Sequence, residues 1–154
     1  MYIQLYEKLV IIQKAYENIQ ALGEQIYENL KHKNVNAVQK LQVEQLQYID
    51  GLKKLSSSFE EMVVQFCKEK GIEPFRVSAL FSHFSNEEIE KKEELQKNVA
   101  ELEENVKMIL LKNQYYLNVL LKTTESIVDS VSEYNLERNN NSQNLYEQTS
   151  IKGK

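Results

Sequence analysis

The chain has 154 residues, of which four are Gly and one is Pro, and its formal net charge is −4. A β-sandwich, a barrel or a doubly wound sheet of this length needs many tight turns, which Gly, Pro, Asn and Asp usually form. With only two Asp in addition, the composition predicts an all-α protein with few connections. The negative charge argues against nucleic acid as the main partner, because phosphate binding usually requires a basic surface.

Catalytic and metal chemistry has few candidate residues. The two His and the single Cys are too few and too far apart for a CxxC pair, an HExxH motif or a disulfide framework. No Asp lies near His32 or His83, and neither His completes the Glu-x-x-His motif of di-iron bundles. We therefore expect no catalytic residue, no metal ligand and no cofactor. The longest apolar runs, 9–12 and 108–111, are also far too short to insert into a membrane.

Apolar residues at alternating gaps of three and four predict a first helix over about 2–32. Gly23 occupies the one missing step of this pattern, so either a neighbouring backbone comes close there or the helix bends. A basic and Asn-rich segment over 31–36 predicts the first connection. A second helix is predicted over about 36–70, where Gly71 serves as its left-handed cap.

Residues 74–84 hold three of the five Phe and predict a short helix that packs against one end of the bundle. Ser85 followed by Glu88 forms a capping box, which predicts the start of a long helix over about 86–135. Acidic residues crowd its first half, and we interpret them as a solvated face rather than as a site for a basic partner. The predicted fold is an antiparallel helical bundle or coiled coil of three main helices over 1–136.

After residue 136 the apolar periodicity stops, and residues 137–154 are polar and rich in Asn. This composition predicts a flexible C-terminal tail. Leu145 and Tyr146 form a candidate docking motif in the tail, because one aromatic side chain is an effective anchor for a small interface. The alternative is that the tail is inert.

Residues 108–121 are apolar on more than one stripe of the long helix. A helix that is apolar on several sides must be buried on several sides. The segment therefore lies either in the middle of the bundle or against a partner helix. Asn113 falls on the inner stripe, where a single buried Asn commonly fixes the register of packed helices, and the alternative is a direct ligand contact.

Two segments carry a resemblance to a known family. Leu110–Leu117, with Leu120 and Leu121 after it, resembles a pattern of Leu and Asn followed by paired aliphatic residues late in the last helix of the FlgN-type flagellar export chaperones. The segment Asn144–Ser150 resembles the Tyr-containing tail of the same family. The order of two antiparallel helices, a linker with a short helix, a long helix and a tail is also similar.

The resemblance implies a cytoplasmic type III export chaperone that is not an enzyme. Such proteins bind the helical terminal segments of flagellar hook-associated proteins, which form the hook–filament junction, prevent their premature assembly and deliver them to the export gate. The client-binding residues that it implies are Asn113, Tyr116, Leu117, Leu120, Leu121 and Ile127. Leu145 and Tyr146 would dock to the export gate.

The residues alone leave a second hypothesis open, a structural coiled-coil protein that self-associates through the same stripe. Under either hypothesis, the long helix can form a homodimer when no client is bound.

Overall fold

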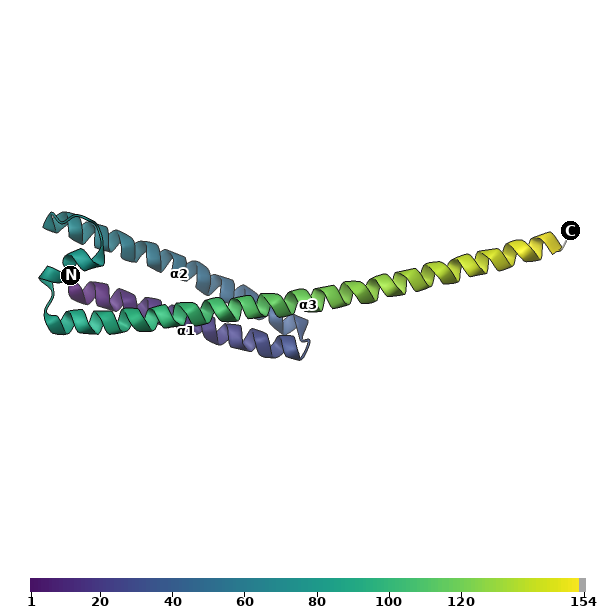
Figure 1. The fold of residues 1–154 in the computed structure, drawn as a ribbon, viewed down its shortest axis with the longest axis horizontal. Coiled ribbons are helices and arrows are strands. Elements are labelled where there is room, and N and C mark those ends of the chain that lie inside the picture. The colour runs from purple at the N-terminus through teal and green to yellow at the C-terminus, as the bar shows by residue number, and fades with distance from the viewer. Residues whose placement is uncertain (153–154) are drawn as a thin grey trace. The chain divides into compact units, whose positions relative to one another are not determined.

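The computed structural model describes the backbone of residues 1–152 and the side chains of residues 1–132. The elements in chain order are α1 (Tyr2–Lys31), α2 (Val35–Lys70), the 3-10 helix η1 (Val77–His83) and α3 (Asn86–Lys152) (Figure 1). No strand occurs in this described part of the chain, and the all-α prediction is confirmed. The chain divides into two units, residues 1–113 and residues 114–154, and α3 contributes to both.

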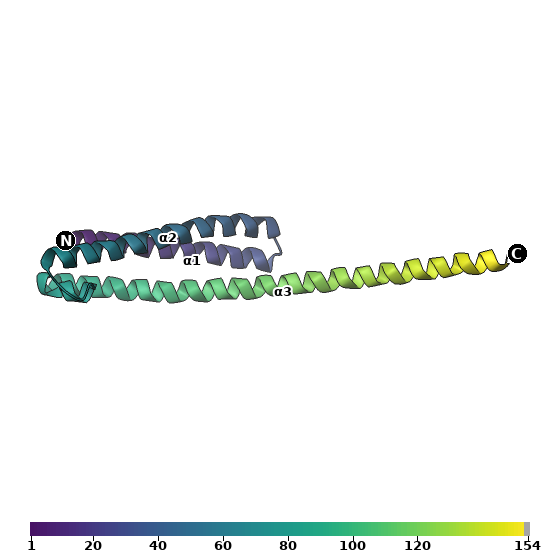
Figure 2. The same ribbon diagram turned by 90° about the horizontal axis from the view of Figure 1, so that it is seen from above.

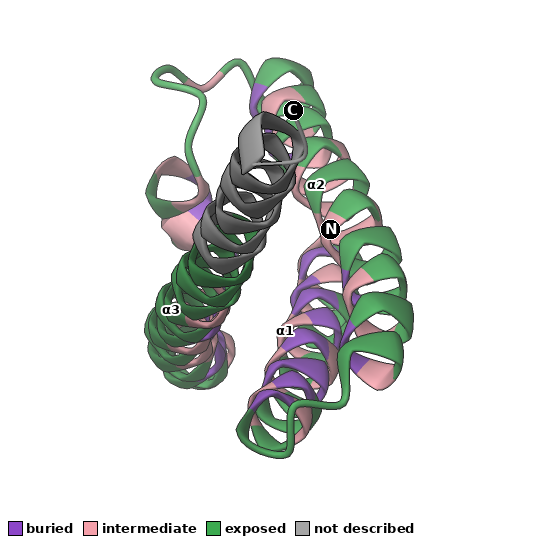
Figure 3. Ribbon diagram, turned by 90° about the vertical axis from the view of Figure 1, so that its right-hand side faces the viewer, coloured by how far each residue is buried: buried purple, intermediate pink, exposed green. Residues whose placement is uncertain are grey.

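The first unit is a helical bundle in which α1 and α2 run antiparallel, side by side, and the first part of α3 runs beside them (Figure 1, Figure 2). Helix α1 supplies most of the core, as the buried positions along it in Figure 3 show. Apart from the adjacent Leu22 and Gly23, these positions recur every three or four residues; they are Leu5, Leu9, Ile12, Ala15, Ile19, Leu22, Gly23, Ile26 and Leu30. The apolar spacing of the sequence therefore corresponds to the buried face of α1.

The element η1 packs against one end of this bundle. Leu80 of η1 is fully buried. Together with Phe84, the residue after η1, it forms a cluster with Leu5, Val63 and Cys67. The helical turns begin at Val77 rather than at residue 74, because Arg76 still has an extended conformation (φ −145°, ψ 155°).

Side chains and backbone conformation define the helix ends at the positions expected from the sequence. Gly71 adopts the left-handed conformation with φ 63° after α2. The Ser85 Oγ accepts a hydrogen bond from the Glu88 backbone N–H at 3.2 Å, and Glu88 Oε2 accepts one from the Ser85 N–H at 2.8 Å. In the first connection, Asn34 caps the N-terminus of α2. The residue before it, Lys33, adopts a left-handed conformation with φ 55°.

Helix α3 approaches α1 closely at Gly23. A Cβ atom at Gly23 would lie 2.8 Å from Cγ2 and 3.0 Å from Cγ1 of Ile109 in α3. The Asn113 Nδ2 donates a hydrogen bond of 2.8 Å to the Gly23 carbonyl oxygen. Close approach of a neighbouring helix therefore accounts for the glycine in the α1 pattern, whereas a Cβ at Gly51 of α2 would meet nothing within 4 Å.

The acidic first half of α3 is a solvated face except at one position. Exposed ion pairs join Lys91 to Glu87 at 2.8 Å and Lys107 to Glu103 at 3.2 Å, as a solvated face predicts. Lys92, however, is only 3% exposed, and its Nζ lies 3.9 Å from the centroid of the Phe81 ring. Burial lowers the pKa of the Lys92 ammonium. Phe81, which precedes α3 in the chain, covers Lys92. The charge pattern of α3 alone did not predict the burial of this Lys.

Helix α3 continues past the end expected near residue 135. Its backbone is helical to Lys152, which includes most of the segment predicted as a flexible tail. No Gly or Pro occurs between residues 86 and 152, so nothing in the sequence breaks the helix, although its apolar periodicity stops. The side chains of Leu145 and Tyr146 lie outside the described residues.

Candidate binding surface on helix α3

Among the predicted client-binding residues, Asn113 is a core residue of the first unit. It is 7% exposed, and its amide nitrogen is bonded to the Gly23 carbonyl oxygen of α1. Its Oδ1 atom is buried without a hydrogen-bond partner. Of the two roles considered for Asn113, the register-fixing contact between packed helices is the one that this geometry supports.

The other predicted residues lie together in the second unit, within residues 114–132 of α3. Tyr116, Leu121 and Ile127 are exposed, and Leu117 and Leu120 are half-buried. The structure adds four exposed apolar neighbours to the same stretch, which are Tyr115, Val119, Val128 and Val131. Val128 was not singled out from the sequence, although its spacing of seven from Leu121 places it on the same side of the helix.

Charge is confined to one side of this stretch. Successive helical residues are rotated by about 100°, so Lys122, Glu125 and Asp129 fall within about 60° of one another. These are the only charged residues between 114 and 132, and about 300° of the helix circumference therefore carries no charge. Single exposed apolar residues are ordinary on a protein surface, but a continuous set of this kind marks an interaction site.

Three hydroxyl side chains that interrupt the uncharged face already have partners for their donors. Thr123 and Thr124 donate to the carbonyl oxygens of Val119 and Leu120, each at 2.9 Å. Ser130 donates to the Ser126 carbonyl oxygen at 2.8 Å. A partner can therefore cover these residues without leaving a buried hydroxyl donor unsatisfied, which would cost about 1–3 kcal/mol each. We name the uncharged side of residues 115–131 the apolar face of α3.

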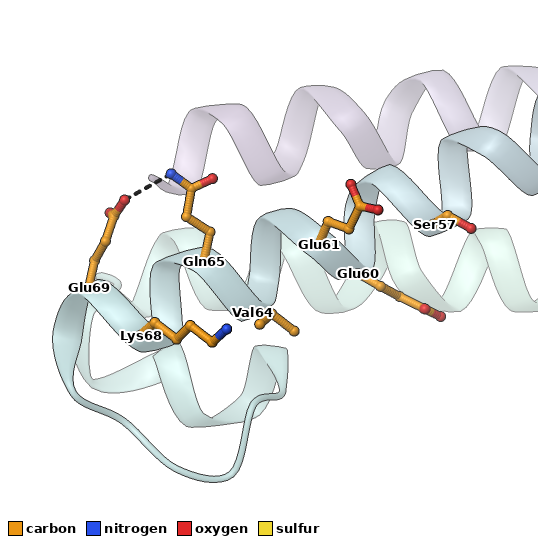
Figure 4. A pocket seen from close by; sticks show the side chains of 7 residues that line it. All are labelled: Ser57, Glu60, Glu61, Val64, Gln65, Lys68 and Glu69. Atoms are coloured by element: carbon orange, nitrogen blue, oxygen red, sulfur yellow. Dashed lines mark hydrogen bonds between the residues drawn. The ribbon is translucent and has the colours of Figure 1, made fainter.

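Other hollows on the surface are weaker candidates. A hollow of about 630 Å³ is lined by residues of α2 alone, from Ser57 to Glu69, with Gln65 hydrogen-bonded to Glu69 (Figure 4). A smaller apolar groove of about 300 Å³ runs between α1 and α2 beside Gly51 and Tyr48. Neither brings together groups with acid, base or nucleophile geometry.

The described residues contain no group of three or more His, Cys, Asp or Glu side chains that could hold a metal ion. Cys67 is fully buried, and its Sγ contacts the Arg76 carbonyl oxygen at 3.8 Å. The described helices also lack a stretch long and apolar enough to cross a membrane. Comparisons with protein-family models, with curated proteins and with solved structures find no match to this chain.

Proposed function

We propose that the protein is an export chaperone of the FlgN type, which binds helical terminal segments of flagellar hook-associated proteins on the apolar face of α3. The observation that carries this proposal is the set of exposed apolar residues over 115–131, with charge confined to the opposite side. The resemblance of residues 110–121 to the last helix of that family supports the same assignment.

The chemistry of the client follows from the apolar face. An amphipathic helix buries its apolar stripe against another helix through residues spaced three and four apart. Such a stripe covers about 100° of a helix, and the uncharged side of α3 is more than twice as wide. The proposed client therefore contributes apolar helical surface on more than one side of α3. This binding would prevent the client segments from pairing with one another before export.

The tail has a separate role in this proposal. Leu145 and Tyr146 dock to the export gate, as the resemblance of Asn144–Ser150 to the family tail implies. An anchor of one aromatic and one aliphatic residue gives a contact of modest affinity, which suits a reversible delivery step. Separate segments would thus hold the client and dock the complex.

The experiment is a binding assay between the purified full chain and purified hook-associated proteins from a flagellated bacterium. Leu117→Glu and Ile127→Glu place a charge on the apolar face, and each should weaken client binding at least about tenfold, because an unpaired charge is costly to bury. Asn118→Glu, on the charged side of the same helix turn, is the matched control and should bind normally. Tyr146→Ala should retain client binding and lose binding to the export gate.

Two results would contradict the proposal. The first is that the folded wild-type chain, verified by circular dichroism, retains no hook-associated protein. The second is that Tyr146→Ala loses the client and the export gate together, which would refute the separate roles of the helix and the tail.

A further inference from the structure

The apolar face of α3 is chemically symmetric about the midpoint between Thr123 and Thr124. Three pairs of residues at equal distances on either side of this point are apolar on both sides: Leu120 with Ile127, Val119 with Val128, and Tyr116 with Val131. The unlike pairs are Leu117 with Ser130 and Leu121 with Ser126. Thr123 and Thr124 are themselves the innermost pair, and both bond their hydroxyls within α3. A face whose two halves match in this way is complementary to itself when one copy is turned end over end.

We propose that, in the absence of other partners, this face binds the same face of a second copy of the chain in antiparallel orientation. The two-fold axis passes between Thr123 and Thr124. Leu120 then lies opposite Ile127 of the partner subunit, and Ile127 lies opposite the partner's Leu120. This inference concerns the protein alone and does not depend on the proposed client.

The positions of the charges favour a second copy. Lys122, Glu125 and Asp129 all lie on the side of the helix away from the symmetric face. Pairing two copies through that face therefore buries no charge and brings no like charges together. The face also has no unbonded hydroxyl donor at Thr123, Thr124 or Ser130.

The small side chains favour the antiparallel orientation over a parallel one. In a parallel pair in register, Thr123 and Ser130 each face their own copies, so small side chains meet both at the centre and near one end of the contact. In the antiparallel pair they meet only at the centre, where Thr123 faces Thr124 of the partner subunit. In the antiparallel pair, Ser130 faces Leu117 of the partner subunit, so a small residue meets a large one. Helix interfaces pack well when large and small residues alternate across facing positions.

The contact is short, which sets the expected affinity. Residues 116–131 extend about 22 Å along the helix, and a helix pair of this length buries less surface than a typical stable interface. We therefore expect a dimer that forms at micromolar concentration and dissociates on dilution.

Disulfide trapping tests the orientation. Leu120→Cys and Ile127→Cys are prepared separately in the full chain, and the only native thiol, Cys67, is fully buried and serves as the internal control. An antiparallel pair crosslinks when the two variants are mixed and oxidised, and each variant alone crosslinks weakly. The two positions are about 10 Å apart along the helix, beyond the 4.4–6.8 Å between Cα atoms that a disulfide spans.

Crosslinking of each variant with itself, and no increase on mixing, would overturn the antiparallel arrangement. Sedimentation of the wild-type chain then tests self-association itself. Leu120→Glu should raise the dimer dissociation constant at least about a hundredfold, since each copy buries a charge against an apolar side chain. Asn118→Glu, on the charged side, should leave the dissociation constant within about threefold of wild type. A wild-type chain that stays monomeric up to about 100 μM, well above the expected range for micromolar binding, would overturn the inference.

Discussion

Replacement of Gly23 by Ala tests the packing of α3 on α1, and Gly51→Ala provides a matched control. Both glycines lie inside α-helices, and neither has a positive φ. Alanine is the better helix former by about 1 kcal/mol, so helix propensity alone predicts the same stabilisation at both sites. Any difference between the two variants therefore reports the surroundings of the added methyl group.

The structure predicts opposite signs. At Gly51 the added Cβ meets nothing within 4 Å, so Gly51→Ala should stabilise the protein by about 0.5–1 kcal/mol. At Gly23 the Cβ would lie 2.8 Å from Ile109 Cγ2, about 0.7 Å inside the 3.5 Å at which carbon–carbon contacts become favourable. These Ile109 atoms are attached directly to a β-branched carbon, which makes them stiff. Overpacking of this kind typically costs about 1–3 kcal/mol.

A shift of α3 would relieve the contact only by weakening another. Moving the helix outward by about 0.7 Å lengthens the 2.8 Å bond between Asn113 Nδ2 and the Gly23 carbonyl oxygen to the limit of a hydrogen bond. A lost hydrogen bond of this type costs about 0.5–1.5 kcal/mol. After subtraction of the propensity gain, Gly23→Ala should destabilise the protein by about 0–2 kcal/mol.

Urea denaturation followed by far-UV circular dichroism measures both variants. Ile109→Ala provides the rescue, because it removes both γ-carbons, and in that background Gly23→Ala should become stabilising. Equal stabilisation by Gly23→Ala and Gly51→Ala in the wild-type background would refute the close approach of α3 to α1.

Two further substitutions test buried polar groups of the first unit. Asn113→Leu should stay within about 1 kcal/mol of wild type in urea denaturation, whereas Asn113→Asp should lose about 2–3 kcal/mol, because a carboxylate cannot donate to the Gly23 carbonyl oxygen. Equal stabilities of the Leu and Asp variants would contradict the burial of this side chain. Lys92→Met should be about 1 kcal/mol more stable near neutral pH, because it removes a buried charge. Burial lowers the pKa of Lys92 in the folded chain below 10.5, its ordinary value in the unfolded chain. At a pH between the folded and unfolded pKa values, the unfolded chain binds more protons than the folded chain, so Lys92 makes the free energy of unfolding rise with pH. The stability gap between Lys92→Met and wild type should therefore narrow through that window, and a gap independent of pH would contradict the lowered pKa.

Features encoded by neighbouring residues were predictable from the sequence. The Ser85–Glu88 capping box and the left-handed Gly71 depend on residues within one helical turn, and both occur in the structure. The apolar spacing likewise predicted the buried face of α1. The end of α3 was less predictable, because loss of apolar periodicity indicates where packing stops, and it does not stop the backbone from continuing as a helix.

Features that depend on distant residues were not predictable in the same way. Gly23 and Gly51 are both helical glycines, and the side chains of Ile109 and Gln45 near Gly23 distinguish their surroundings. The burial of Lys92 requires Phe81, and the role of Asn113 requires a carbonyl group 90 residues earlier in the chain. Tertiary contacts of this kind leave no periodic pattern in a single sequence.

The change in exposure along α3 is the strongest argument that the apolar face exists for a partner. The apolar spacing that includes Val106 and Asn113, both buried in the first unit, continues through Leu120, Ile127 and Val131 without a break. Ile127 is 60% exposed and Val131 is 54% exposed within the single chain. A stripe required only for the chain's own core would have no reason to extend over these positions. The same residues are best explained if another helical surface, from a client or a second copy, covers them.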